Sequence, residues 1–591
     1  MAAISSNGTG GGDWDAGATW VGGVVPGASA ADSVTIVAGD TVSLNITTHT
    51  STVTTVTIDA TGKLTIDAQF NTDAKFTGDW SVSGEVEFNK ASGTYELRIQ
   101  GEFSIKSGGT LDMDGTAAGC KQILSSDATA DESAFFDAES GSIIIITGRA
   151  KTGRSQLDGA HTTANTTITV TDDTGWEEND VIALIRDHNN HETVTLGTVV
   201  TGKEWNIDEA NLTKTHNDLG EAWNLTRSCV VQSSDASFSP ICDFLAGATL
   251  TVQQAEFYHL DQVTINGQTL TDCSTWGVES GEKGFRAEDS DIPCTFVRCI
   301  AHCISSGGSG FETLYTAELD TCCAGPQFEV GVLLTTPDGA RSHIHDCIFI
   351  SGFYSIRINN GVFWDTLIEN CYVFGGGDGV ISRDNSGSGT VTACVFGREP
   401  GGTVNENDQS DCNVLDSSEL IFDDCEYNSS VSHIVAEGGR IVSLNHNNLP
   451  GYRLETQEFG VSESDSTDAR SASYCDSITP SSADYPFRYM TRFFCDTGKT
   501  PTLKLYAKED GSFNGDITVS LGRHRCGLTD VASSTGSLDA NDQFTVSSSY
   551  GLITITLEGT STGRGEVELF IDVTGTAGVV YFDDFEASNN T

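Results

Sequence analysis

The sequence predicts an all-β fold: a right-handed parallel β-helix with a small inserted β-subdomain and a C-terminal β-sandwich. Three observations lead to this prediction. Cysteines recur at a nearly constant spacing in the middle of the chain, and short β-forming runs separated by Gly, Asn, Asp and Ser surround them. No segment there has the 3.6-residue apolar periodicity that a helical repeat needs. Longer strands with clean alternation follow only near the end of the chain.

The cysteine repeat identifies the kind of solenoid. It comprises Cys273, Cys299, Cys323, Cys347, Cys371, Cys394 and Cys425, with successive steps of 26, 24, 24, 24, 23 and 31 residues. Parallel strands stack about 4.8 Å apart, so equivalent residues of successive coils form rows. We expect Cys299, Cys323, Cys347, Cys371 and Cys394 to form one inward-facing, reduced column, because a thiol packs like a small hydrophobic group.

Disulfides between adjacent coils and metal sites are the alternatives for this column. The total of 17 cysteines is odd, which argues against a complete disulfide framework. No paired CxxC motif has zinc-ligand spacing. We therefore expect no metal and no cofactor.

The amino-acid composition limits the classes of binding partner that we expect for this protein. The formal net charge of −52 repels nucleic acid and anionic membrane surfaces, and it disfavours polyanionic substrates. No apolar run approaches the 18 or so residues of a membrane-spanning helix. The first residues lack the basic and apolar regions of a secretory signal, so we expect no signal peptide.

Residues 1–150 are expected to form an N-terminal cap and the first coils. Trp20, Gly22, Gly23 and Pro26 form a loop that precedes two short alternating strands. Such a loop covers the open end of a solenoid, where unpaired strand edges would otherwise be exposed. Alternating runs broken by glycine then continue to about residue 150.

Residues 151–235 change in character and are expected to form the inserted β-subdomain. Gly175-Trp176, Asp180 and Leu225-Thr226-Arg227, together with the opening loop at Trp20, resemble the extracellular domain named for its eight glycines. The resemblance covers about residues 1–235. It extends to β-helix proteins of bacteria and phages, and it implies a scaffold role. Trp176, Trp205 and Trp223 are expected in the subdomain core, with a sugar-stacking face as the alternative.

The main β-helix with its cysteine column is expected over residues 236–450, and a linker with a β-sandwich over 451–591. Runs such as Ile517 to Leu521 and Val567 to Val573 alternate over longer stretches, as sandwich strands do. The ending from Val580 to Glu586 resembles the final strand of jelly-roll carbohydrate-binding modules.

Candidate catalytic residues gather in the coils after residue 340. They are Arg357, Arg383, Asp365, Asp378, Asp384 and His343. Arg357 and Arg383 are 26 residues apart and His343 and Asp365 are 22 apart, so each pair is expected on adjacent coils. Arginine would bind a sugar carboxylate while a carboxylate or histidine moves the proton. The structural alternative is a Gly-rich turn around Asp378 and a solvated Arg–Asp face.

Two functions follow from these expectations. The preferred one is a non-enzymatic structural or adhesion protein of a virion, such as a phage tail, fibre or capsid-surface component, with a β-sandwich that binds a glycan or a partner. The alternative is a polysaccharide-degrading hydrolase or lyase of the tailspike type. The expected partners are other virion proteins or a cell-surface glycan, with no nucleic acid and no membrane insertion. The expected assembly is a homo-oligomer, with a trimer among the options, on a virion or an extracellular surface.

Overall fold

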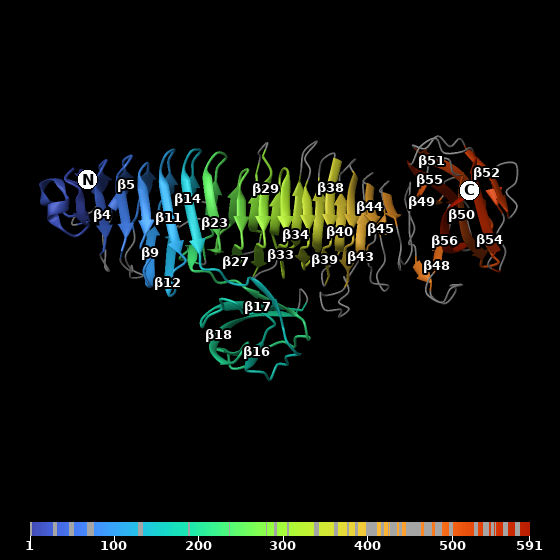
Figure 1. Ribbon diagram of the computed structural model, residues 1–591, viewed down its shortest axis with the longest axis horizontal. Coiled ribbons are helices and arrows are strands. Elements are labelled where there is room, and N and C mark those ends of the chain that lie inside the picture. The colour runs from blue at the N-terminus through green and yellow to red at the C-terminus, as the bar shows by residue number, and fades with distance from the viewer. Residues whose placement is uncertain are drawn as a thin grey trace. The chain divides into compact units, whose positions relative to one another are not determined.

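The chain folds almost entirely into β-strands (Figure 1). The computed structural model describes residues 3–590 except 28–31, 46–52, 68–75, 128–133, 187–189, 236, 279–280, 289–291, 304–306, 336–341, 360–363, 375–377, 384–387, 398–409, 415–418, 424, 426–433, 436–439, 445–462, 466–474, 479–486, 496–499, 525–529, 536–542, 545–548, 550, 559–564 and 574–579. The helical elements in the described part are two 3₁₀ turns, η1 (Gly17–Thr19) and η2 (Val21–Gly23). No helix among the described residues is long and apolar enough to cross a bilayer.

Two compact units make up the chain. One holds Met1–Thr335 and Ser342–Ser355, and the other holds Ile356–Arg398 and Val404–Thr591, apart from two short exchanged segments.

The first unit contains three parallel sheets whose strands stack coil upon coil (Figure 1). The first sheet runs β1 (Ala3–Ser5), β3 (Asp32–Ile36), β5 (Val53–Ile58), β7 (Asp79–Val82), β10 (Phe103–Ile105), β13 (Ala134–Ala138), β22 (Ile241–Phe244), β25 (Gln262–Ile265), β28 (Lys283–Ala287), β31 (Ser309–Thr313) and β34 (Val330–Thr335). The second sheet runs β2 (Gly11–Asp13), β4 (Thr41–Leu44), β6 (Lys63–Ile66), β8 (Glu85–Phe88), β11 (Thr110–Gly115), β14 (Ile143–Gly148), β23 (Thr249–Gln253), β26 (Thr269–Thr271), β29 (Cys294–Val297), β32 (Ala317–Asp320) and β35 (His343–His345). The third sheet runs β9 (Gly93–Ile99), β12 (Cys120–Ser126), β21 (Cys229–Ser233), β24 (Ala255–Tyr258), β27 (Ser274–Val278), β30 (Ile300–Cys303), β33 (Cys323–Ala324) and β36 (Ile348–Phe349).

The second unit repeats the same parallel arrangement before its C-terminal part. Its three sets are β37 (Tyr354–Asn359), β40 (Asp378–Arg383), β43 (Ser410–Val414) and β45 (Ile434–Val435); β38 (Trp364–Glu369), β41 (Ser388–Thr392), β44 (Glu419–Asp423) and β46 (Arg440–Leu444); and β39 (Tyr372–Val373) and β42 (Val395–Phe396). Parallel pairing of successive coils confirms the predicted all-β parallel solenoid.

Antiparallel sheets occur in two stretches. The first stretch forms β15 (Arg154–Gln156), β20 (Glu221–Asn224), β17 (Val181–Ile185), β18 (His191–Thr201), β19 (Glu204–Ile207) and β16 (Thr167–Thr169). The C-terminal stretch forms one sheet of β47 (Glu463–Asp465), β48 (Cys475–Ile478), β56 (Val580–Asn590), β50 (Thr500–Glu509), β54 (Gly551–Glu558) and β52 (Asp530–Thr535), and another of β49 (Phe487–Cys495), β55 (Gly565–Val573), β51 (Ile517–His524) and β53 (Gln543–Phe544). The domain boundaries near 150, 235 and 450 stay predictions.

Side chains that alternate between inward and outward positions along each strand form the interior of the solenoid. In β3 the buried and partly exposed residues alternate strictly, as a two-residue period requires. Aromatic rings from successive coils then stack inside the first unit at centroid separations between 4.9 and 6.5 Å. The stack runs through Phe76, Trp80, Phe103, Phe136, Phe244, Phe257, Phe285 and Phe311. Ring packing of this kind contributes about 0.5–1.5 kcal/mol per pair beyond simple burial.

The N-terminal loop contains two tryptophans whose rings contact each other. Trp20 is 2% exposed, and its indole N–H donates to the Trp14 carbonyl at 2.7 Å. The two rings meet edge to face at 5.1 Å. Gly22 and Gly23 have φ of 79° and 72°, a region that glycine enters without steric cost. The loop thus packs its aromatic residues against the first coils.

The cysteine column is present, with one correction. Each thiol donates to a carbonyl of the preceding coil: Cys299 to Leu270, Cys322 to Phe296 and Cys347 to Leu319, at 3.3–3.6 Å. A residue with left-handed backbone precedes each column cysteine, namely Asp272, Arg298, Thr321, Asp346, Asn370 and Ala393, with φ of 51–57°.

The prediction that Cys323 belongs to this column is wrong. Thr321 has the left-handed backbone, so Cys322 takes the column position and Cys323 begins β33. Cys323 pairs instead with Ile300 and Ile348 on the neighbouring strands. The cysteines whose side chains the structure describes, which include the column members from Cys273 to Cys394, are buried and free of disulfides. Burial raises the pKa of Cys273, Cys299 and Cys394 well above the ordinary value, so these thiols stay protonated at neutral pH.

Candidate functional site

The residues predicted to be catalytic lie on two different sets of strands. Arg357, Asp378 and Arg383 lie on β37 and β40, whereas His343 lies on β35 and Asp365 on β38. β37 and β40 are neighbours, as expected for the two arginines on adjacent coils. Asp384 lies outside the described residues.

The described side chains of this set have mixed environments. The Arg357 Nε atom donates to the Asn359 side-chain oxygen at 2.8 Å. Asp378 is only 2% exposed, so its carboxyl group is poorly placed to meet a polymer from solvent. His343 is half-buried and paired in register with Glu318 of β32. Catalysis by this set stays a prediction.

A pair of aromatic rings stands on the outward face of the third sheet. Gln232, Tyr258 and Trp276 are Cα partners on the successive strands β21, β24 and β27. Their neighbour Phe257 is fully buried, so alternation turns Tyr258 outward. The rings of Tyr258 and Trp276 lie 4.1 Å apart with an interplanar angle of 39°, and both side chains are half-buried. We call Gln232, Tyr258 and Trp276 the aromatic platform.

Local hydrogen bonds and one glycine hold the platform. The Trp276 indole N–H donates to a Glu256 carboxylate oxygen at 2.9 Å. Gly277 has φ of 73°, and a Cβ atom there would lie 2.8 Å from the Tyr258 ring. Only glycine therefore combines this backbone conformation with the observed position of the tyrosine ring.

Polar groups extend the platform along the preceding coils. The Gln232 amide donates to the Ser125 hydroxyl at 3.1 Å, and that hydroxyl donates to Glu96 at 2.8 Å. Arg98 forms an ion pair with the same carboxylate at 3.3 Å. The arrangement provides apolar ring surface beside hydrogen-bonding groups, which suits a sugar ring with its apolar C–H face and its hydroxyl groups.

A second feature is a pair of carboxylates on the first sheet. Asp137 of β13 and Asp243 of β22 are direct Cα partners on adjacent coils, both half-buried. Burial and the nearby Glu139 raise the pKa of Asp137. Burial, Glu288 and Asp137 raise the pKa of Asp243, against the opposing effects of Thr264 and Arg286. Two aspartates in register on adjacent coils, both with raised pKa values, are candidates for an acid and base pair.

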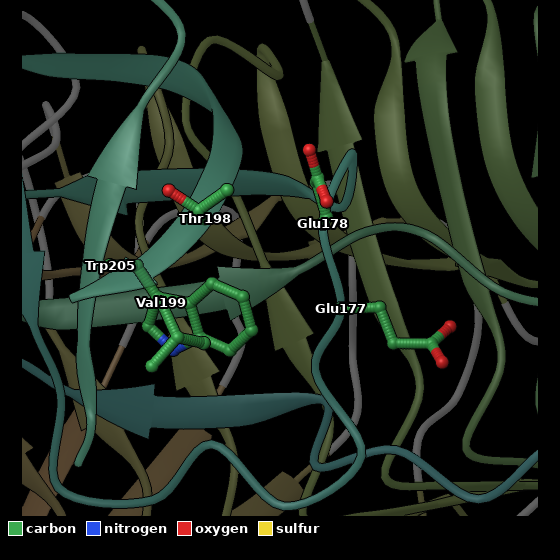
Figure 2. A pocket seen from close by; sticks show the side chains of 5 residues that line it. All are labelled: Glu177, Glu178, Thr198, Val199 and Trp205. Carbon is green, nitrogen blue, oxygen red and sulfur yellow. The ribbon is translucent and has the colours of Figure 1, made fainter. Parts of the chain in front are cut away.

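A shallow pocket lies on the antiparallel sheet of residues 154–224. Its volume is about 530 Å³, and it is lined by Glu177, Glu178, Thr198, Val199 and Trp205. Figure 2 shows the Trp205 ring beside Val199, with the Glu177 carboxylate pointing away from them. Trp205 is 5% exposed and donates to Asp173 at 3.0 Å. Its ring belongs to the core of this sheet, the role expected for it, and offers little stacking surface.

Sequence inspection identified neither the aromatic platform nor the carboxylate pair. Tyr258 and Trp276 are 18 residues apart and Asp137 and Asp243 are 106 apart, so neither pair matches the 24-residue cysteine period. Both pairs could be found from the sequence by counting, in each short strand, from the turn that precedes the strand to its outward-facing positions.

Comparisons with known proteins give structural similarities only. No protein-family model and no curated protein matches the chain. The tailspike protein gp49 of Pseudomonas phage LKA1 is 13% identical, with 83% of this chain and 91% of that chain covered, at a TM-score of 0.25. The Gp54 tailspike of Acinetobacter baumannii bacteriophage AP22, solved in complex with a capsular saccharide, is 9% identical, with 83% and 91% covered, at 0.21. TmCBM61 in complex with β-1,4-galactotriose is 11% identical, with 21% and 77% covered, at 0.16. Similarities this low transfer neither an activity nor a ligand to this chain.

Proposed function

We propose that this chain is an attachment protein of a virion surface, in which the β-solenoid presents the aromatic platform to a host polysaccharide. The observation that carries the proposal is the closely packed, outward-facing ring pair of Tyr258 and Trp276 with Gln232 in register. The placement on a virion follows the resemblance of residues 1–235 to β-helix proteins of bacteria and phages. Assembly as a homo-oligomer with other virion proteins belongs to the same proposal.

The chemistry of the platform favours binding over catalysis. Glu256 is the carboxylate nearest to the rings, and it is 4% exposed. One of its oxygens accepts the Trp276 indole N–H, and the other accepts the Arg227 backbone N–H at 2.8 Å. Because both oxygens are already bonded, Glu256 positions the rings and is not free to attack a sugar.

The net charge limits the choice of glycan. At −52 the protein repels polyanions at low salt, so a neutral polysaccharide is the expected ligand. Stacking on an aromatic ring needs no charge, because the attraction comes from apolar contact and dispersion.

Binding to a panel of immobilised neutral capsular and lipopolysaccharide O-chain glycans tests the proposal. We expect Tyr258→Ala to weaken the best interaction by about 1–3 kcal/mol, the range for losing an aromatic side chain that stacks on a nucleic-acid base. Trp276→Phe, which keeps a ring, should lose less than Trp276→Ala. Phe353→Ala is the matched control, because Phe353 is an aromatic residue that is 53% exposed away from the platform. Failure of the wild type to bind any of these glycans, or full binding by Tyr258→Ala, would contradict the proposal.

The carboxylate pair on the first sheet favours glycoside hydrolysis as a second candidate function. Cα atoms on adjacent parallel strands are about 4.8 Å apart. Retaining glycosidases hold their two carboxyl groups about 5–5.5 Å apart, a separation that side chains projecting from Cα atoms at this spacing can adopt. A raised pKa lets Asp137 or Asp243 keep its proton and act as the acid.

Release of reducing ends from the bound glycan tests this second function. Activity should fall as the pH rises through the raised pKa of the acid, because the acid must be protonated, and Asp243→Asn should abolish it. Asp158→Asn, which removes an exposed carboxylate in the bend after β15, is the control. In the same assay Arg383→Ala examines the other predicted site, where losing a positioned charge costs about 100-fold in rate. Absence of turnover in the wild type would exclude hydrolysis of the bound glycan and leave the binding proposal standing.

A further inference from the structure

Two adjacent strands of the second sheet bring histidines and carboxylates together. β32 contains Glu318-Leu319-Asp320, and β35 contains His343-Ile344-His345. Glu318 pairs with His343, and Asp320 pairs with His345. Leu319 and Ile344 between them are fully buried, so alternation turns the four polar side chains to the same outward face.

The atoms on this face lie at metal-ligand distances from one another. Donor atoms of Glu318, His343 and His345 all lie within 4.8 Å of one another. The two imidazole rings are 4.4 Å apart between centroids, and the His345 Nε2 atom lies 3.5 Å from a Glu318 oxygen. Zinc bonds of about 2.0–2.1 Å in tetrahedral geometry place two ligand atoms roughly 3.3 Å apart. The 3.5 Å separation between the His345 Nε2 atom and the Glu318 oxygen is therefore close to the separation of two ligand atoms on one zinc ion.

The other nitrogen of His345 is held by carboxylates. Its Nδ1 atom lies 3.0 Å from an Asp346 oxygen and 3.6 Å from an Asp320 oxygen. A carboxylate that accepts from Nδ1–H fixes the tautomer with its lone pair on Nε2, as at many metal-binding histidines.

We propose that Glu318, His343 and His345 form a binding site for a divalent transition-metal ion such as Zn²⁺, with Asp320 and Asp346 orienting His345. Two imidazoles and one carboxylate suit Zn²⁺, Ni²⁺ or Co²⁺ better than Mg²⁺ or Ca²⁺, which prefer all-oxygen ligand sets. Three protein ligands leave at least one position on the ion open to water or to an oxygen of another molecule. The site is independent of the aromatic platform and of the carboxylate pair.

Calorimetric titration of the full chain with zinc chloride tests the site, with magnesium chloride as the comparison ion. We expect saturable Zn²⁺ binding and none of comparable strength with Mg²⁺. His343→Ala and His345→Ala should each weaken Zn²⁺ binding by more than about 10-fold, because even orienting partners of a ligand cost about 10- to 100-fold. Asp346→Asn should have a smaller effect, since it leaves all three ligands in place. Glu87→Gln is the matched control, because Glu85, Glu87 and Asp112 form a cluster of carboxylates without histidine.

Cobalt absorption distinguishes this site from the buried thiols. Co²⁺ bound by imidazole and carboxylate gives visible bands without the intense near-ultraviolet band of a cobalt–thiolate bond. Loss of those bands in His343→Ala would support the site. Undiminished Zn²⁺ binding in the His343→Ala and His345→Ala double variant, or a thiolate band in the wild type, would overturn the proposal.

Discussion

The Arg227→Ala variant should lose at least about 3 kcal/mol of unfolding free energy, the scale on which buried polar networks fail when one member is removed. Arg227 is 1% exposed and lies between β20 and β21. Its guanidinium group donates to the carbonyls of Asn224, Thr226 and Asp272 at 2.9–3.0 Å. Removing the side chain leaves these carbonyls without that donor and opens a cavity beside them.

The charge on the buried Arg227 guanidinium group is subject to two opposing electrostatic effects. Burial lowers its pKa, and Cys273, Glu256, Asp180 and Asp272 oppose that effect. Burying the charge is costly in itself, so the side chain stabilises the fold through the carbonyls that it satisfies and through its attraction to these neighbouring groups. Arg227 therefore joins the antiparallel stretch of residues 154–224 to the third sheet through its hydrogen bonds.

Urea unfolding followed by tryptophan fluorescence measures the loss. Arg298→Ala is the matched control: Arg298 also contacts Asp272, through two 2.7 Å bonds, but its side chain is 52% exposed. Exposed pairs contribute about 0–1 kcal/mol, so this control should change little. Equal effects of the two substitutions would show that burial of Arg227 is unimportant.

The Cys347→Asp variant should fail to accumulate as folded protein. Cys347 is fully buried, and its thiol lies 3.4 Å from the Leu319 carbonyl and 3.1 Å from the His345 carbonyl. An aspartate there would direct a charged oxygen at two carbonyl oxygens without solvent. Burying such a charge without a cationic partner costs several kcal/mol.

Cys347→Ser is the control for that substitution. A hydroxyl can donate to one of these carbonyls and accept the Cys322 backbone N–H, which now lies 3.2 Å from the sulfur. The serine variant should therefore fold, with a modest loss for replacing an apolar atom by a polar one. The soluble yield and circular dichroism of both variants provide the measurement. Soluble Cys347→Asp with the wild-type spectrum would mean that the column is not closed to water.

The part of the fold that could be predicted from the sequence is the part that depends on local residue patterns. Alternation with a period of two, as in Asp32–Ile36, depends only on neighbouring residues and indicates a strand wherever it occurs. The cysteine period predicts stacking because one small buried residue follows the same corner in coil after coil. The same pattern failed at Thr321-Cys322-Cys323, where counting favoured Cys323. The left-handed residue decides which cysteine turns inward, and Thr321 is not a residue type that signals it.

The sequence by itself determined that this protein is an all-β parallel solenoid with an interior row of cysteines, because these properties repeat within short stretches of chain. Only the tertiary structure decided which outward residues meet: Tyr258 with Trp276, Asp137 with Asp243, and Glu318 with the two histidines of β35. The physical reason is that the length of chain between equivalent strands varies from coil to coil. Hydrogen-bond register between stacked strands, rather than distance along the chain, places those side chains next to one another.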